Sequence, residues 1–227
     1  MQTRSACGST IGLKFLVALS GLFMILFLVV HLLGNLEVFF GPDATNQYGV
    51  MLRTFPKVLW AFRILLILAV VVHIWVTVVL TRRNQQARPE AYAMKRSRKA
   101  TLSSRTMMLS GLTILAFVAY HLAHYTWGIT NPEYATLQDH LGRAHIYNMV
   151  VMGFSNYWIS AFYILAQALL AFHLSHGISS AARTLGLSCK KRFIIVRHCG
   201  QLFAWGLALL FMSIPIAVLL GMLPLDA

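Results

Sequence analysis

Apolar residues occur in five long stretches separated by polar segments. The stretches cover roughly residues 13–35, 58–81, 107–127, 157–182 and 202–223. At about 1.5 Å per residue, each can span about 30 Å of hydrocarbon as an α-helix. The first is over-long for a secretory signal peptide, so we expect it to remain in the protein. The pattern predicts an all-α integral membrane protein, one domain over residues 1–227, with five transmembrane helices.

The first and third stretches carry the same motif. Residues 20–35 read SGLFMILFLVVHLLGN, and residues 110–124 read SGLTILAFVAYHLAH. In each, a Ser-Gly-Leu triplet is followed by a histidine eleven positions after the serine, at His31 or His121. Eleven residues of α-helix turn through about 1100°, so each serine shares a face with its histidine, about 16 Å away.

The second and fourth stretches each carry a deep histidine as well, His73 and His173, which indicates a duplicated two-helix unit. Counted from the last basic residue on one side, His31 and His121 lie about 24–26 Å deep, and His73 and His173 about 13–15 Å deep. Ionisable side chains at such depth are rare and are functional by default. The sequence therefore predicts two histidine pairs, one joining the first and third helices and one joining the second and fourth.

Two neutral imidazoles at one depth, between apolar walls, suit a metalloporphyrin held inside a four-helix bundle. A single membrane histidine is as readily explained by an interhelical hydrogen bond, but four at paired depths favour ligation. Ligation of iron by two histidines leaves no open position and suits electron transfer. We therefore expect two haems, about 11 Å apart in height, in the bundle of the first four helices, with the fifth helix flanking it.

The small residues of the repeat lie near the deeper pair. Gly21 and Gly111 would let a porphyrin edge approach the backbone. Ser20 and Ser110 could donate hydrogen bonds to a histidine or to a haem propionate. The alternative is that these small residues only let helices pack closely.

Two further histidines, His124 and His176, lie three residues after a candidate ligand. Depth alone does not separate them from His121 and His173, but a propionate partner or a supporting role near the haem fits them better. Zinc is not expected, because no carboxylate or thiolate lies nearby at that depth. The remaining histidines, which we expect near the surface, are His140, His145 and His198.

The net charge of +13 is unevenly distributed. The N-terminus and the loops 82–105 and 183–197 hold fifteen Lys and Arg residues, and the opposite side holds four. The positive-inside rule places the N-terminus and both basic loops in the cytoplasm and the C-terminus outside. The basic face fits anionic lipid headgroups or a cytoplasmic subunit, and we expect no nucleic acid partner.

The three cysteines, Cys7, Cys189 and Cys199, fall toward the reducing side without metal-type spacing and are interpreted as free thiols. A Cys-x-x-Cys-His motif for covalent haem attachment is absent from the sequence.

With five spans and histidines in these positions, the chain resembles the single-polypeptide, dihaem cytochrome b subunit of succinate:quinone and fumarate:quinone oxidoreductases. The resemblance covers nearly the whole chain and is carried by LFLVVHLLGN, SGLTILAFVAYH and AFHLSHG followed by a short basic stretch. It implies that His31 and His121 ligate a distal haem b, and that His73 and His173 ligate a proximal one. It also implies that His124 and His176 are not ligands.

The resemblance further implies a respiratory complex in the bacterial inner membrane. A flavoprotein with covalent FAD and an iron–sulfur subunit would dock on the cytoplasmic face, where the dicarboxylate chemistry occurs. This chain would pass electrons between the iron–sulfur subunit and a membrane quinone, menaquinone. Glu37, six residues beyond His31, is the candidate for proton handling at the quinone; the alternative is an ordinary interfacial carboxylate. Some family members have a glutamate two residues before the helix IV ligand, but this chain has Ala171, which argues against a coupled proton path.

Two other functions remain open. One is the cytochrome b subunit of a nitrate reductase, formate dehydrogenase or hydrogenase, for which we expect a different distribution of ligands. The other is a transporter with a histidine proton relay, in which the histidines need not pair at equal depth.

Overall fold

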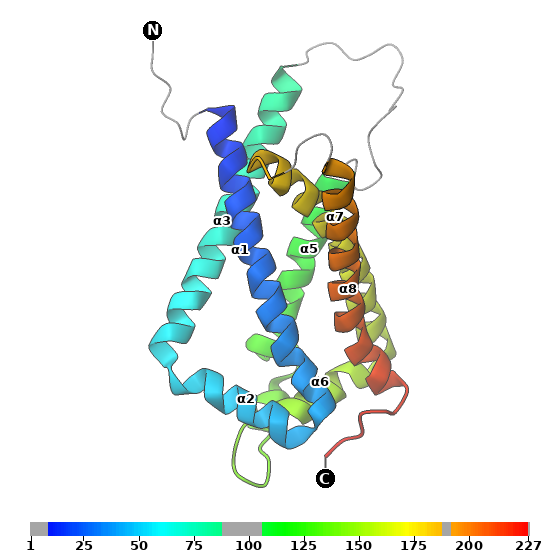
Figure 1. Ribbon diagram of the computed structural model, residues 1–227. Coiled ribbons are helices and arrows are strands. Elements are labelled where there is room, and N and C mark those ends of the chain that lie inside the picture. Colours follow the sequence, from blue (N-terminus) through cyan, green and yellow to red (C-terminus); the bar gives the residue numbers. More distant parts are fainter. Residues whose placement is uncertain (1–8, 88–105, 188–191, 227) are drawn as a thin grey trace.

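The computed structural model describes residues 9–87, 106–187 and 192–226, which fold into helices without a named strand. Five segments are long and apolar enough to cross a membrane (Figure 1). They contain α1 (Thr10–Leu36), α3 (Pro56–Gln86), α5 (Met107–His121), α7 (Tyr157–Thr184) and α8 (Phe193–Leu219). The prediction of a helical, multi-pass membrane protein with five spans is confirmed at this level.

The helices extend beyond the predicted stretches. α8 begins at Phe193 rather than near residue 202, because the polar run after Val196 continues the helix instead of forming a loop. Residues 193–197 of the predicted basic loop 183–197 are therefore helical. The centre of that loop and most of the loop 82–105 lie outside the described residues, as do Cys7 and Cys189. Cys199 is free and exposed.

Short helices gather at one end of the bundle, where α1 finishes (Figure 1). They are η2 (Glu37–Phe40), α2 (Pro42–Thr54), η4 (Pro132–Thr136) and α6 (Ile146–Ser155). α2 lies across this end. α6 was not expected, because its ten residues lie between the third and fourth apolar stretches and are too few to span a membrane.

The long helices pack side by side around α1 and α7. α1 packs against α3 and α7, and α5 packs against α7. α8 packs along α7 and also contacts α1, where Leu32, Leu174, Ala204 and Leu207 form a buried cluster. Ala171 and Ala208 are fully buried, and their small side chains allow α7 and α8 to approach closely. The fifth helix therefore does more than flank the others.

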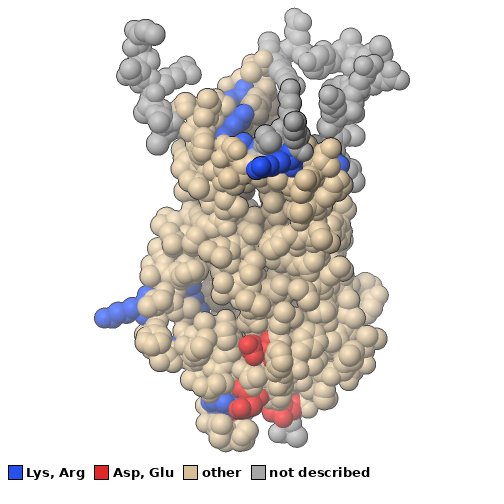
Figure 2. Space-filling model, viewed as in Figure 1, with Lys and Arg blue, Asp and Glu red and all other residues tan. Residues whose placement is uncertain are grey.

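Charge is segregated along the bundle (Figure 2). Lys and Arg gather at the end where α1 begins, which we call the basic end. Asp and Glu gather at the end that carries α2 and α6, which we call the acidic end. Between the two ends, basic side chains protrude at the left of this view, and the rest of the surface is free of charge, as expected of a surface in contact with lipid.

A buried polar cluster at the acidic end joins α2, the loop before α6, and α6. Asn46 is 1% exposed. Its side-chain nitrogen donates to Asp139 (3.1 Å) and lies 3.4 Å from His145 Nδ1, and its oxygen accepts from the backbone N–H of Tyr147 (3.1 Å). His145 in turn lies 3.3 Å from the carboxylate of Asp226. One side chain thus ties three segments together beneath the bundle.

Arg143 extends this cluster with two ion pairs, to Asp139 and Asp43, each at 2.7 Å. Burial by itself raises the pKa of Asp139. The hydrogen bonds from Arg143, Asn46 and the N–H of Leu141 outweigh it, and the pKa lies well below its ordinary value. Asp139 therefore stays ionised at neutral pH. Its contribution to stability is present above the ordinary aspartate pKa of about 4 and is lost as the pH falls through the folded-state value.

We expect Asn46→Ala to lower the free energy of unfolding by about 2 kcal/mol or more, because it leaves buried hydrogen-bonding groups without partners. The neighbouring Gln47→Ala, at an exposed amide, is the matched control and should change it by less than about 0.5 kcal/mol. Thermal unfolding in detergent, followed by near-ultraviolet circular dichroism, measures both. Equal melting temperatures for the two variants would show that the Asn46 bonds do not hold this end together.

Candidate functional site

The four deep histidines lie at two levels of the bundle. Nearer the acidic end, His31 of α1 and His121 of α5 have ring centroids 5.8 Å apart and ring planes at 84°. Nearer the basic end, His73 of α3 is close enough to His173 of α7 to act on it electrostatically. The structure thus brings together the histidines that depth arithmetic paired. Ligation of iron by them stays a prediction.

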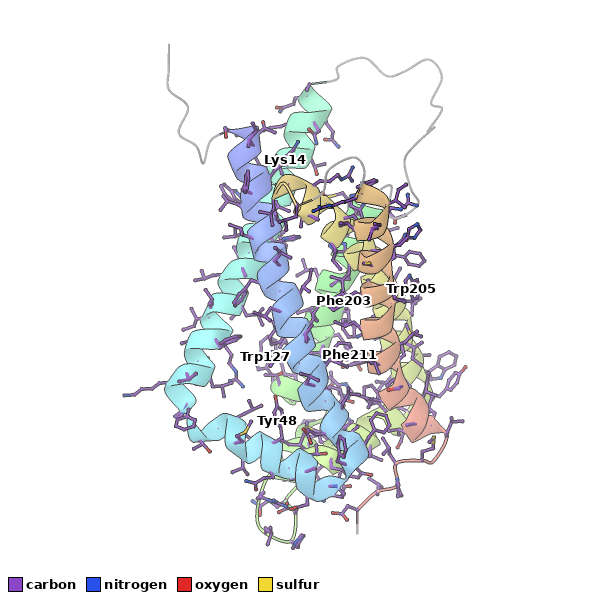
Figure 3. All side chains as sticks on the ribbon, in the orientation of Figure 1. Lys14, Tyr48, Trp127, Phe203, Trp205 and Phe211 are labelled. Carbon is purple, nitrogen blue, oxygen red and sulfur yellow. The ribbon has the colours of Figure 1, made fainter. Side chains whose placement is uncertain are left out.

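Aromatic side chains surround the pair nearer the acidic end. Phe27 stacks on His31 with centroids 5.3 Å apart, and Phe117 stacks on His121 at 5.9 Å. Phe211, labelled on α8 in Figure 3, lies 6.0 Å from His31. These rings exclude water from the imidazoles, and one of them comes from the helix expected only to flank the site.

Each histidine of the other pair is held by a serine of the repeat. Ser20 Oγ lies 3.2 Å from His73 Nδ1, and Ser110 Oγ lies 3.1 Å from His173 Nδ1. Both serines are buried. The contact with a histidine, which was one of the expected roles of these serines, joins α1 to α3 and α5 to α7.

The direction of these hydrogen bonds follows from the backbone contacts of the serines. Ser20 Oγ donates its proton to the carbonyl of Leu16 (2.7 Å), and Ser110 Oγ donates to that of Met107 (3.1 Å). A hydroxyl has one proton, so each serine then accepts from the Nδ1–H of its histidine. This tautomer leaves Nε2 of both rings with a free lone pair, which a metal ion can use.

The repeat also sets the distance between the two levels. His31 follows Ser20 by eleven residues on one helix, and His121 follows Ser110 by eleven on another. Since each serine contacts a histidine of the other level, the levels are about 16 Å apart along the bundle. The count down to the nearest basic residues gave about 11 Å instead, because it places all four of those residues at one height.

The glycines of the repeat face histidine rings rather than an open edge. A Cβ on Gly21 would lie 3.4 Å from Cε1 of His73, and a Cβ on Gly111 would lie 3.4 Å from Cε1 of His173. These are ordinary van der Waals contacts, so an alanine would also fit beside either imidazole. Their expected contact with a porphyrin edge stays a prediction.

Asn35 is the partner of His31. Its side-chain nitrogen donates to the His31 carbonyl (2.7 Å) and lies 3.3 Å from His31 Nε2. An amide NH₂ can only donate, so Nε2 of His31 is the unprotonated nitrogen in this contact. The same lone pair is the one that a metal ion between His31 and His121 would take.

The geometry fits a porphyrin-bound metal better than a bare ion. Among the described residues no three His, Cys, Asp or Glu side chains converge as a metal site would need. Each level instead offers two imidazoles, and a porphyrin supplies the other four nitrogens. Two imidazoles that hold one metal from opposite sides, through bonds of about 2 Å, have centroids about 6 Å apart. The 5.8 Å between His31 and His121 agrees with this spacing.

Tyr163 of α7 links two histidines of α5 and was missed by sequence reasoning. Its hydroxyl lies 3.4 Å from His121 Nδ1 and 3.1 Å from His124 Nδ1. The end of α5 widens here into a π-helical turn, η3 (Leu122–Thr126), in which the N–H of Trp127 donates to the Leu122 carbonyl (2.8 Å). Such turns are rare and are frequent at functional sites. The spacing of His121 and His124 marks this place in the sequence. It does not point to Tyr163, which lies 39 residues from His124 in the chain.

The remaining candidates lie around these two levels. Glu37 begins η2 and is half-buried beside Tyr48, which Figure 3 labels at the acidic end. Burial raises the pKa of Tyr48, and the nearby Glu37 carboxylate raises it further. His176 lies one turn beyond His173 on α7, toward Arg183, and His124 is fully buried.

Comparison with known proteins gives no relative. No family model matches the chain, and neither a curated protein nor a solved structure matches it. The function therefore has to be argued from the residues and their geometry.

The packing of Tyr125 beneath the histidines can be tested at Gly153. A Cβ on Gly153 would overlap the ring and hydroxyl of Tyr125, so Gly153→Ala should destabilise the protein by about 1–3 kcal/mol. Gly206→Ala is the matched control in α8, where nothing lies within 4 Å, and should stabilise by about 0.5–1 kcal/mol. Melting temperatures in one detergent compare them. A gain of stability in Gly153→Ala would contradict the packing described.

Proposed function

We propose that this protein is the dihaem cytochrome b membrane anchor of a succinate:quinone or fumarate:quinone oxidoreductase. The observation that carries the proposal is the arrangement of four half-buried histidines as two pairs, at two levels of a bundle whose helices are long and apolar enough to span a membrane. His31 and His121 hold the distal haem b, and His73 and His173 hold the proximal one. Bound there, the haems supply one-electron redox chemistry.

The side chains of the protein prepare both levels for iron. At the proximal level Ser20 and Ser110 fix the Nδ1–H tautomer, so Nε2 of each histidine keeps the lone pair that would bind the metal. A hydrogen bond from Nδ1–H also raises the basicity of the ligating nitrogen and holds the ring in place. At the distal level Phe27, Phe117 and Phe211 keep water away.

The segregation of charge supports an orientation in the membrane and a docking end for the partner subunits. The basic end, which we place in the cytoplasm with the N-terminus, docks the iron–sulfur subunit and its FAD-bearing flavoprotein. The C-terminal end of α8 then lies outside the bacterial inner membrane. Electrons pass between the iron–sulfur subunit and a membrane quinone through the two levels, which stand about 16 Å apart. A quinone takes two electrons and two protons to become a quinol.

Menaquinone is the quinone that we propose, at the distal level near the acidic end. Glu37 follows His31 by six residues and is half-buried, which suits a group that exchanges protons with the outer aqueous phase. A carboxylate on a short helix at this end can reach both the bundle and the surface.

A histidine-relay transporter is the second candidate, and one observation favours it. The contacts from His121 through Tyr163 to His124 form a hydrogen-bonded chain that could carry a proton. This series of hydrogen bonds does not reach His73 and His173, which argues for the first proposal.

We expect the chain, purified from a host supplied with haem, to show reduced b-type absorption bands with about two haems per polypeptide. His73→Ala or His173→Ala should remove one haem and leave the other, because each pair holds its own iron. The exposed His198→Ala is the matched control and should retain both. Haem content by the pyridine haemochrome assay measures this. A colourless protein would refute the proposal, and two haems in either variant would refute the assignment of ligands.

We expect Ser20→Ala and Ser110→Ala to act on the proximal haem alone. Loss of the acceptor for Nδ1–H lowers the basicity of the ligand, so the midpoint potential of that haem should rise and its dissociation should speed up about tenfold or more. Thr113→Ala, at a hydroxyl of α5 that bonds only to the Leu109 carbonyl, is the control. A spectroelectrochemical titration resolves the two haems. A shift of the distal haem only would show that the serines act elsewhere.

A further inference from the structure

Two polar atoms beside the distal pair are buried and have no hydrogen-bond partner among the described residues. They are Nε2 of His124 and the hydroxyl of Tyr125. The two side chains are neighbours on the π-helical turn, with ring centroids 4.0 Å apart, and His124 is 0% exposed. A buried polar group without a partner is destabilising, so two of them side by side favour a site that a ligand occupies.

The hydrogen-bonded chain fixes what His124 can offer such a ligand. If Nε2 of His121 holds iron, as proposed above, its Nδ1 carries the proton and donates to the Tyr163 oxygen. The Tyr163 hydroxyl then donates its single proton to His124 Nδ1, which is its other hydrogen-bond partner among the described residues. A neutral His124 must then carry its own proton on Nε2. Ligation at His121 therefore turns His124 Nε2–H into a hydrogen-bond donor.

The surroundings of His124 favour a neutral acceptor over a charged one. Its neighbours are the aromatic rings of Tyr120, Tyr125, Tyr134 and Tyr163. None of the ion pairs found in the described part of the chain reaches this place. A carboxylate buried there without a cation would be strongly disfavoured, whereas a carbonyl oxygen between aromatic rings would not.

We propose that His124 Nε2–H, with the Tyr125 hydroxyl beside it, binds a carbonyl oxygen of the quinone next to the distal haem. This rests on the proposed function and names the residues that recognise its substrate. Tyr163 is a positioning residue, because it touches His121 and His124 and sets the tautomer. Tyr134, from the η4 segment, packs with its ring centroid 5.9 Å from that of His124.

The site differs from the one expected at Glu37. That carboxylate lies beside Tyr48, at the junction of α1 and η2. The two proposals are compatible, because a quinone needs a partner that binds its carbonyl and a route for protons. His124 supplies the first and Glu37 the second.

The test is the binding of 2,3-dimethyl-1,4-naphthoquinone to the full-length, haem-loaded chain, measured by equilibrium dialysis. We expect His124→Leu to weaken binding about tenfold or more, with both haems retained, because the donor is lost. His124→Gln, which keeps an N–H donor, should restore much of the affinity. His140→Leu, at an exposed histidine of the outer loop, is the matched control and should bind like the unaltered protein.

Unchanged affinity in His124→Leu, with both haems present, would overturn this inference and leave the cytochrome proposal intact. Loss or a spectral shift of the distal haem with unchanged affinity would instead assign His124 to a haem propionate, and would also overturn it. Failure of the unaltered chain to hold haem would defeat the function proposed above. If His124→Leu does not accumulate, Tyr163→Phe serves in its place. It should weaken binding several-fold and raise the distal potential, and unchanged affinity would overturn the inference.

Discussion

An imidazole inside an apolar bundle needs a hydrogen-bond partner, and the structure depends on how that need is met. Ser20 and Ser110 accept from the histidines of one level, while Asn35 and Tyr163 contact those of the other. The contacts of the two serines and of Asn35 fix which ring nitrogen carries a proton, because each serine has already given its one proton to a carbonyl and an amide NH₂ can only donate. Packing alone would place the rings but would leave their chemistry undefined.

The same serines connect the two levels. A serine eleven residues before a histidine lies on the same face of its helix, so one helix serves its own histidine and that of its neighbour. α1 does this with α3, and α5 does it with α7. The helices of each couple are therefore joined at the histidines, and the two levels are held at a set spacing by backbone geometry. The electron path that we propose would need such a fixed spacing.

Polar groups also hold the acidic end together. There the side chains of Asn46, Asp139 and Arg143 form hydrogen bonds and ion pairs that join separate segments. The cluster holds α2 and α6 beneath the open end of the bundle, close to the level of His31 and His121. A satisfied polar network rigidifies and specifies a unique arrangement, so this cap keeps the distal level enclosed.

The sequence by itself determined the spans, the segregation of charge and the pairing of His31 with His121 and of His73 with His173. Hydrophobic length and helical period are properties of one segment, and matched depth follows from them. The sequence did not predict α6, because a helix of ten residues is too short to be recognised as a membrane span.

Only the tertiary structure decided that Tyr163 lies between His121 and His124, that Phe211 reaches His31, and that α5 ends in a π-helical turn. These depend on how each helix is rotated against its neighbours. That rotation is set by packing between segments far apart in the chain, which no local pattern contains.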